Sequence, residues 1–115
     1  MIEAARCPDG CLADDYLTSL ERSRKPRDRD KLVDIALVFE EYAHTGELAI
    51  PRELNDLVDG IREIKVGKHR FPFFYPRADS KFPVRLTHGF LKGTVETPRQ
   101  EINKAKWVRR EDLAS

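Results

Sequence analysis

The sequence predicts a small α+β protein, in which two helices precede an antiparallel sheet and a third helix follows it. Three observations predict this class. Apolar residues recur every three or four positions over residues 12–23 and 30–45, short β-rich runs fill residues 61–90, and helical spacing returns after residue 98. A chain of 115 residues is the length of one ordinary domain, so we expect residues 1–115 to share a single core.

The two N-terminal helices are predicted from periodicity and stop signals. Residues 12–23 place apolar side chains at helical spacing and carry two aspartates in the first turn, where acidic residues are favourable. The polar run around Pro26 has no apolar periodicity and is therefore predicted to be a connector. A longer helix is expected from Asp30 onward, and Gly46 supplies its stop signal.

The sheet is predicted as a meander of three strands. The runs IREIKV (61–66) and HRFPFFY (69–75) read as a hairpin whose turn is formed by Gly67 and Lys68. Residues 81–90 alternate between apolar and polar side chains and supply the third strand. Two further segments complete the prediction, namely a short first strand at residues 2–6 and, at residues 47–60, a loop with a single helical turn as an alternative.

Pro72 interrupts the second strand of this hairpin. Strand alternation places Arg70, Pro72 and Phe74 on one face and the neighbouring Phe71 and Phe73 on the other. Proline has no N–H to donate to a neighbouring strand, so we expect a bulge or an unpaired edge at this position.

The last helix has an explicit start signal. Thr97, Pro98 and Gln100 fit the N-cap, N1 and N3 positions of a capping box. One face of this helix is apolar and the opposite face carries lysines and arginines. We expect Trp107 to pack against the core rather than to serve as an exposed contact.

The two halves of the chain carry opposite charge. Residues 1–60 hold 8 Lys and Arg against 14 Asp and Glu, a net charge of −6, whereas residues 61–110 hold 13 against 4, a net charge of +9. A basic half suits a phosphate-rich partner, because neutralising phosphates releases counterions. The alternative is that the opposite charges pair with each other across the fold.

Metal, cofactor and membrane roles find no support in the sequence. Cys7 and Cys11 have no second cysteine pair to complete a zinc site of the CxxC type, so we assign them no role and expect no cofactor. No stretch approaches the roughly 18 apolar residues that a membrane span needs. The first residues also lack the basic and apolar pattern of a signal peptide, so a cytoplasmic protein is expected.

Two stretches of the second half resemble a known family. GIREIKVGKHRFPFFY and VRLTHGFLKGTVETPRQEINKA are similar to the RelE/HigB superfamily of toxins from type II toxin–antitoxin systems, specifically its phage-derived HigB-like branch. That branch typically shows an ELR strand, a YRILYF strand and then LHGFxKKTxKTPxxEIxxA. The match runs from Gly60 to about Ala105, and the preceding helices agree only in order and length.

This resemblance implies a RelE-like fold and a small ribonuclease that cuts messenger RNA in the ribosomal decoding site and is silenced by a helix-turn-helix antitoxin. Four residues occupy the positions of interest: Lys65 stands at the arginine of ELR, Arg70 keeps the arginine of YR, His88 keeps the histidine of HGF, and Lys92 keeps the first lysine after it. Three positions depart from the pattern, namely His69 for an aromatic residue, Pro72 within the strand and Gly93 for the second lysine. These departures bear on activity more than on fold.

The chemistry of RNA cleavage without a metal fits the four candidate catalytic residues. The 2′-hydroxyl must lose a proton, the transition state must be neutralised, and the leaving oxygen must gain a proton. Lysine and arginine supply positive charge. His88, with an ordinary pKa near ~6.5, is suited to move protons near neutrality if it lies at the solvent edge of the sheet. The expected RNA-binding residues are Arg62, Lys68, Arg85, Lys104 and Lys106.

Other readings of the same residues stay open. Each candidate has a structural alternative: Arg70 bonds a loop carbonyl or Asp79, and His88 makes a structural hydrogen bond at a strand end. Two further function classes compete with the toxin ribonuclease. One is a toxin-fold protein that binds RNA, the ribosome or a protein partner without cleavage, and the other is an interaction module that uses the acidic first half.

Overall fold

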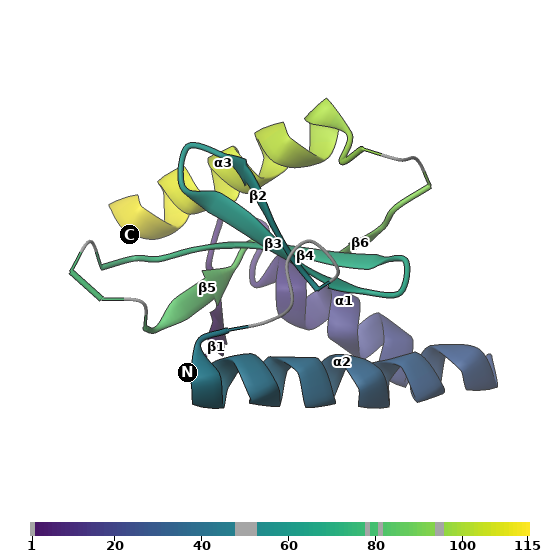
Figure 1. The fold of residues 1–115 in the computed structure, drawn as a ribbon. Coiled ribbons are helices and arrows are strands. Elements are labelled where there is room, and N and C mark those ends of the chain that lie inside the picture. Colours follow the sequence, from purple (N-terminus) through teal and green to yellow (C-terminus); the bar gives the residue numbers. More distant parts are fainter. Residues whose placement is uncertain (1, 48–52, 78, 81, 94–95) are drawn as a thin grey trace.

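The computed structural model describes residues 2–47, 53–77, 79–80, 82–93 and 96–115. Within these ranges one sheet lies between α3 on one face and α1 and α2 on the other (Figure 1). The helices are α1 (Leu12–Glu21), α2 (Pro26–Thr45) and α3 (Arg99–Ala114). The strands are β1 (Ile2–Ala4), β2 (Leu54–Val58), β3 (Ile61–Val66), β4 (His69–Phe74), β5 (Val84–Leu86) and β6 (Phe90–Leu91).

The predicted α+β class is confirmed, with a sheet that is larger than predicted and mixed in direction. The strand order is β1-β5-β4-β3-β2. The short strand β6 also pairs with β4, on the same side as β5. Every pair is antiparallel except β1 with β5, which is parallel. The three strands of the predicted meander pair antiparallel, as expected. The parallel direction of β1 was not predicted, because it depends on a partner more than 80 residues away and not on the strand's own sequence.

The segment expected to be a loop before the hairpin contains a strand. Residues 48–52 of that segment lie outside the described residues, but β2 pairs with β3 and buries Leu54 against the core. The turn that joins β2 to β3 is formed by Asp59 and Gly60, both with positive φ (53° and 79°). Two such residues are typical of a tight type I′ hairpin, so the Asp-Gly pair was the signal for this strand.

The second helix begins earlier than predicted. Pro26 occupies the first turn of α2, four residues before the predicted start at Asp30. Proline is favoured at this position, because its fixed φ suits a helix and the missing N–H has no partner there in any case. Asp28 in the same turn accepts a hydrogen bond of 2.6 Å from the hydroxyl of Ser23. The end at Gly46, which adopts a left-handed conformation, is confirmed.

Pro72 lies in the interior of the sheet and not at an edge. On the side of β4 that faces away from β3, two different strands pair with it. β6 pairs with the first two residues of β4 and β5 with the last two. Pro72 lies in the gap between them, and its carbonyl accepts the N–H of Thr87 at 2.8 Å. In a strand, N–H and C=O of one residue point to the same side, so the missing donor also faces this gap. The predicted continuous third strand is therefore split at Thr87–Gly89.

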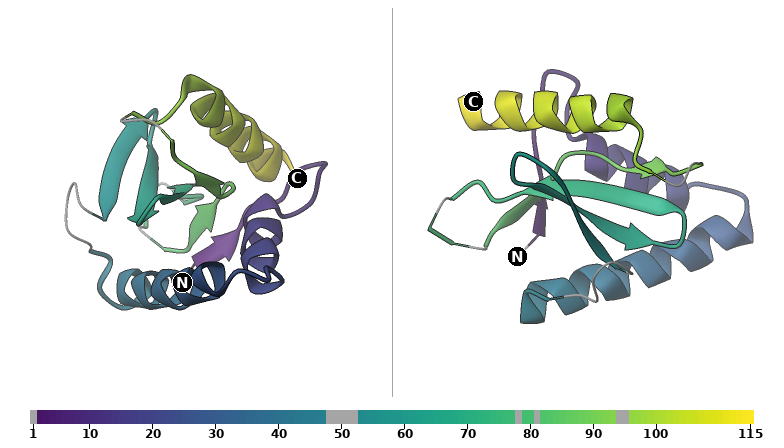
Figure 2. Two further views of the ribbon diagram at one scale, coloured as in Figure 1. Left: turned by 90° about the vertical axis from the view of Figure 1, so that its right-hand side faces the viewer. Right: turned by 45° about the horizontal axis from the view of Figure 1, so that its top comes forward.

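The two faces of the sheet carry separate apolar clusters, as the alternation in β4 predicts. Figure 2 shows the helices that cover these two faces. Phe71 and Phe73 point to the side of α1 and α2, where Ile35 and Tyr42 also pack. Phe74 points to the side of α3 and packs with buried residues of that helix and of the segment after β1. Trp107 is half-buried against this second cluster, so its expected packing role is confirmed.

Candidate nucleic-acid interface

Two of the four candidate catalytic residues lie side by side on the sheet. Lys65 of β3 is directly opposite Arg70 of β4, and Phe90 of β6 is opposite Arg70 on its other side. Opposed residues of antiparallel strands project from the same face. Glu63, two residues before Lys65, shares that face and contacts Thr97 at the start of α3. The pair therefore lies on the α3 face of the sheet.

Hydrogen bonds to the β3–β4 turn hold the guanidinium of Arg70. Its Nη1 donates to the carbonyl of Gly67 at 2.6 Å and to that of His69 at 3.0 Å. The side chain is only 13% exposed, and its buried Nε has no hydrogen-bond partner among the described residues. Oε1 of Glu63 lies 4.0 Å from Nε. The loop-carbonyl alternative for Arg70 is thus observed, and the bonds fix its position.

Glu63 is a buried acid that the sequence analysis did not single out. Its side chain is completely buried, and the hydroxyl of Thr97 donates to its carboxylate at 2.9 Å. Thr97 consequently does not cap α3, and the predicted capping box is wrong: Pro98 is the N-cap and the helix starts at Arg99. The available signal was strand parity, because Glu63 shares a face with the buried Ile61.

His88 is buried, which contradicts its expected place at the solvent edge. The side chain is 1% exposed and stacks on Phe90 with ring centroids 5.5 Å apart. Burial, with a smaller contribution from Lys104, lowers the pKa of His88 to about 3. The imidazole is therefore neutral near pH 7. The break after β5 is the cause, because it turns this side chain under α3 instead of leaving it at a strand edge.

Both nitrogens of the neutral His88 ring have partners. Nδ1 lies 2.9 Å from the hydroxyl of Thr87, and Nε2 lies 3.2 Å from Oε1 of Glu101. A carboxylate only accepts, so the proton belongs on Nε2 and Nδ1 accepts from the hydroxyl. This arrangement leaves neither nitrogen free to exchange a proton with a ligand.

Three further lysines lie around this part of the sheet. The backbone N–H of Lys92 donates to the carbonyl of Lys68 at 2.8 Å, which brings both residues to the β3–β4 turn. Lys68 is exposed and Lys92 is half-buried. Lys104 is exposed on α3, close enough to His88 to affect its pKa. We call this group the sheet cation cluster; its members are Lys65, Lys68, Arg70, Lys92 and Lys104.

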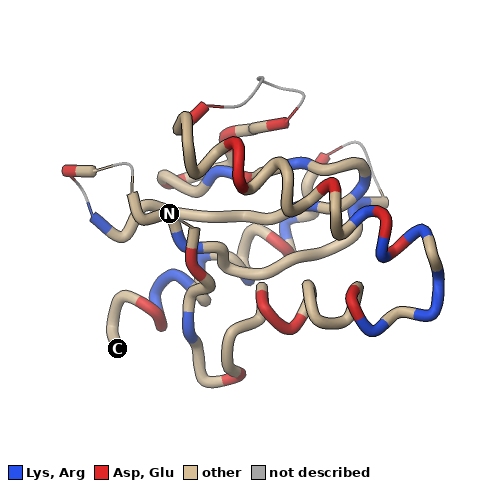
Figure 3. The backbone as a smooth tube through the Cα atoms, turned by 90° about the horizontal axis from the view of Figure 1, so that it is seen from below, with Lys and Arg blue, Asp and Glu red and all other residues tan. Residues whose placement is uncertain are grey.

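The other three predicted RNA-binding residues are engaged in ion pairs elsewhere. Each of them pairs with an acid from outside residues 61–110, so here the opposite charges of the chain do pair across the fold. Figure 3 shows acidic and basic positions interspersed along much of the chain. The pairs are Arg62 with Asp56 (2.6 Å), Arg85 with Asp112 (2.7 Å) and Glu3 (3.3 Å), and Lys106 with Asp59 (3.1 Å).

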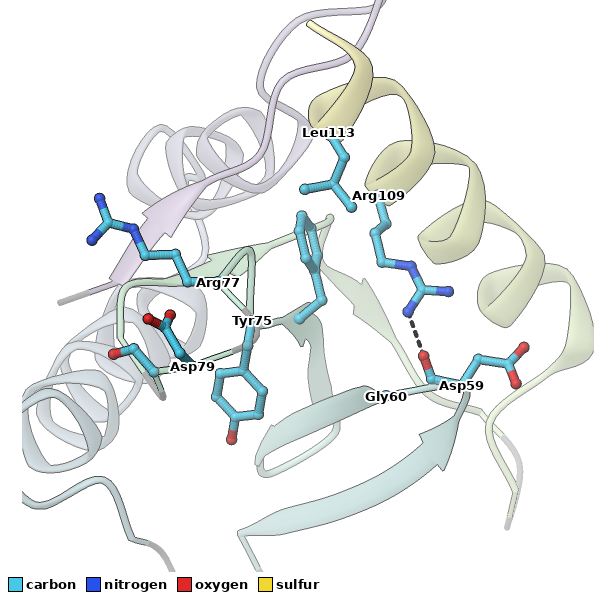
Figure 4. Close-up of a pocket in the computed structure, with 9 residues that line it drawn as sticks. Asp59, Gly60, Tyr75, Arg77, Asp79, Arg109 and Leu113 are labelled. Carbon is cyan, nitrogen blue, oxygen red and sulfur yellow. Dashed lines mark hydrogen bonds between the residues drawn. The ribbon is translucent and has the colours of Figure 1, made fainter.

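A hollow of about 560 Å³ lies at the other end of β4 from Arg70 (Figure 4). Arg109 and Leu113 of α3 form one wall, and Tyr75 and Arg77 lie across from them. The guanidinium of Arg109 donates to the backbone carbonyl of Asp59. This hollow is separate from the sheet cation cluster, and none of the nine predicted site residues lines it.

The described part of the chain contains no cluster of side chains that could bind a metal ion. No group of three or more His, Cys, Asp and Glu side chains is placed there to hold a metal ion. Cys7 and Cys11 are both half-buried free thiols, and the backbone of Cys7 pairs with Gly10 in a tight turn. Across the same residues, no helix combines the length and the apolar character that crossing a bilayer requires.

Comparison with known proteins gives no assignment. No protein-family model matches the sequence, and no curated protein matches it. The candidate site therefore depends on the geometry of the described residues and on the resemblance carried by residues 60–105.

Proposed function

We propose that this protein is the toxin of a toxin–antitoxin pair of the RelE/HigB type, a cytoplasmic endoribonuclease that cuts messenger RNA on the ribosome. The observation that carries the proposal is the position of Lys65 directly opposite Arg70 on adjacent strands. Opposed Cα atoms in antiparallel strands are about 4.5–5.5 Å apart, so the two side chains can reach the same phosphate.

The sheet cation cluster suits the charge that develops during RNA cleavage. The 2′-oxygen attacks the adjacent phosphorus, loses its proton, and displaces the 5′-oxygen, which gains one. Negative charge builds on the phosphate oxygens, and Lys65 and Arg70 would stabilise it. Cations that are already held in place stabilise a transition state best, because little reorganisation is needed when charge appears. The carbonyls of Gly67 and His69, which hold Arg70, provide such preorganisation.

His88 has a positioning role in this proposal and not the proton-transfer role predicted from sequence. Its ring supports Phe90, which lies next to Arg70, and it contacts Glu101 in the first turn of α3. The burial of His88 also favours a second candidate, namely a toxin-fold protein that binds RNA or the ribosome without cutting. Both candidates share the cationic surface and differ only in chemistry.

A cognate helix-turn-helix antitoxin is the proposed protein partner. A nuclease that acts on messenger RNA harms its own cell unless it is neutralised, so a partner that covers the sheet cation cluster is required. Acidic segments bind such a surface most readily, because complementary charge raises the association rate. The antitoxin is expected to block RNA access to Lys65 and Arg70.

The test is cleavage of messenger RNA on purified ribosomes, with growth after induced expression as the cellular readout. Lys65→Ala and Arg70→Ala should each reduce cleavage by about 10²-fold, the typical loss for a preorganised charge-stabilising group. Arg110→Ala, which removes an exposed cation from α3, is the matched control and should retain cleavage.

The outcomes separate the two candidates. Salt-sensitive RNA binding without cleavage supports the non-cutting protein, since phosphate contacts weaken as salt rises. Absence of RNA binding, cleavage and growth inhibition in the unaltered protein rejects both. Equal losses in the Arg110→Ala control and in the Lys65→Ala and Arg70→Ala proteins would remove the sheet cation cluster from the active site.

A further inference from the structure

A cavity with basic walls lies on the face of the sheet opposite the Lys65–Arg70 pair, and it shares Lys68 of the β3–β4 turn with the sheet cation cluster. It has a volume of about 500 Å³ and is formed between the start of α2 and the β3–β4 turn. His69 lies in its wall and alternates with Arg70 along β4, so the cavity faces away from the Lys65–Arg70 pair. The remaining polar wall is made by Arg27, Asp28, Lys31 and Lys68, with Leu91 as its apolar part.

Positive charge predominates in the cavity wall. Arg27, Lys31 and Lys68 line the cavity with a single carboxylate, that of Asp28, which already accepts a hydrogen bond from Ser23 at 2.6 Å. Lys31 also pairs with Asp34, which is not among the lining residues, at 3.6 Å. Lys31 lies directly over the turn, because a Cβ added to Gly67 would come within 2.9 Å of its Nζ. Figure 3 shows further basic positions around the α1–α2 connection. An anionic ligand would therefore enter a region of positive potential.

His69 supplies a directional donor in the wall of this cavity. Its side chain is 5% exposed, and its Nδ1 lies 2.6 Å from the hydroxyl of Tyr16. Burial lowers the pKa of His69, and burial raises the pKa of Tyr16 to about 12, so the imidazole is neutral and the hydroxyl keeps its proton. The hydroxyl then donates to Nδ1, which leaves the ring N–H on Nε2.

We propose that this cavity binds the phosphate group of a nucleotide. Arg27, Lys31 and Lys68 neutralise the phosphate, and Nε2–H of His69 donates to one of its oxygens. The side chain of Leu91, 64% exposed at the rim, offers an apolar surface to the base. The volume falls within the roughly 300–1,000 Å³ range of small-molecule sites. The nucleotide is either free in solution or the phosphorylated end of an RNA strand, since both present the same chemistry.

The experiment is a titration of the ¹⁵N-labelled full chain, followed through the backbone amide signals of Gly67 and His69. The probes are inorganic phosphate, adenosine 5′-monophosphate, and a short RNA with and without a 5′-phosphate. Saturable shifts with adenosine monophosphate are expected. Lys31→Ala should weaken this binding about tenfold, the usual effect of removing one charge-assisted contact. Arg29→Ala, an exposed cation on the same helix that does not line the cavity, is the control and should leave the affinity unchanged.

Each outcome has a defined meaning. If 5′-phosphorylated RNA binds more tightly than both unphosphorylated RNA and adenosine monophosphate, the cavity is assigned to an RNA end. If 5′-phosphorylated RNA and adenosine monophosphate bind with equal affinity, the cavity is assigned to free nucleotides. Absence of saturable shifts with every probe, or equal weakening by Arg29→Ala and Lys31→Ala, would overturn the proposal. The measurement needs no cleavage activity, so it stands or fails separately from the proposed ribonuclease function.

Discussion

Nε2 of His88 lies 3.2 Å from Oε1 of Glu101, which connects the break between β5 and β6 to the first turn of α3. The contact joins two segments that nothing in their local sequence brings together. His88 is buried and Glu101 is about one quarter exposed, so the hydrogen bond is partly shielded from water. A bond of this kind contributes about 1.5–3 kcal/mol when one partner is charged. The histidine of the HGF motif is therefore a structural link in this protein.

Replacing His88 tests that role directly. His88→Ala should lower the free energy of unfolding by about 2–4 kcal/mol, because it leaves a cavity under α3 and removes the partner of Glu101. His88→Gln, which keeps a donor for the carboxylate, should lose less. Urea unfolding followed by circular dichroism measures both. Cleavage per folded molecule should persist in His88→Gln, and an inactive but fully stable His88→Gln protein would restore the proton-transfer role.

The buried histidines also predict how stability depends on pH. The pKa of His88 falls from 6.5 in the unfolded chain to about 3 in the folded protein, and burial lowers the pKa of His69 in the same direction. Between these values the unfolded chain binds protons that the folded protein does not. The free energy of unfolding should therefore fall as the pH is lowered from about 7 towards 3.

Urea midpoints at pH 7.5, 5.5 and 4.5 measure this dependence. His88→Gln should show a shallower fall than the unaltered protein, and the part that remains includes the contribution of His69. A variant that loses stability in parallel with the unaltered protein at all three pH values would exclude His88 as the titrating group.

Much of the fold could be predicted from local pattern. Alternation in β4 placed Phe71 and Phe73 on one side and Phe74 on the other, as observed. The start of α2 and the presence of β2 were missed, although Pro26 and the Asp59–Gly60 pair are recognised signals of a helix start and a hairpin. The parallel pairing of β1 with β5 had no local signal, because tertiary contacts decide it.

The candidate site was predictable only where it depends on strand register. Register predicts that Lys65 and Arg70 face each other across a tight hairpin, and they do. The burial of His88 depends on the interruption of a strand, and the pairing of Arg85 with Asp112 depends on where α3 packs. Neither can be read from spacing. Sequence reasoning therefore named basic residues but could not show that Arg85 is already paired with acids from distant segments.

The position of Lys65 beside Arg70 and the ion pairs of Arg85 lead to a prediction about RNA affinity. Arg85→Ala breaks pairs with Asp112 and Glu3, so it should destabilise the protein by about 1–3 kcal/mol and leave RNA affinity nearly unchanged. Lys65→Ala should weaken RNA binding and reduce the slope of log affinity against log salt by roughly 1. Filter binding over a range of salt, with urea unfolding of each variant, separates the two effects. A normal affinity in Lys65→Ala, or a large loss in Arg85→Ala, would reverse this assignment.

Gly89 in the HGF motif provides a sharp test of packing. A Cβ added at Gly89 would lie 2.5 Å from Cδ2 of Tyr16 and 2.9 Å from Cε1 of Phe71, well inside van der Waals contact. These two rings pack edge to face, with centroids 5.7 Å apart, between α1 and β4. The rings are too closely packed to move aside at low cost, so Gly89→Ala should lower the free energy of unfolding by about 1–3 kcal/mol. The added methyl group would displace Tyr16 from His69. A change in the tyrosine absorbance on unfolding would report this displacement.

Gly93→Ala is the matched control for this substitution. A Cβ at Gly93 meets no atom of the described residues within 4 Å, so the same change a few residues later is expected to add a methyl group without a clash. Its effect on the free energy of unfolding should stay within about 0.5 kcal/mol, as for other surface changes. Thermal unfolding of the two variants side by side decides the matter. Equal stability would mean that the break after β5 can shift to accommodate a side chain, and the close approach of Gly89 to the two rings would not be required by the fold.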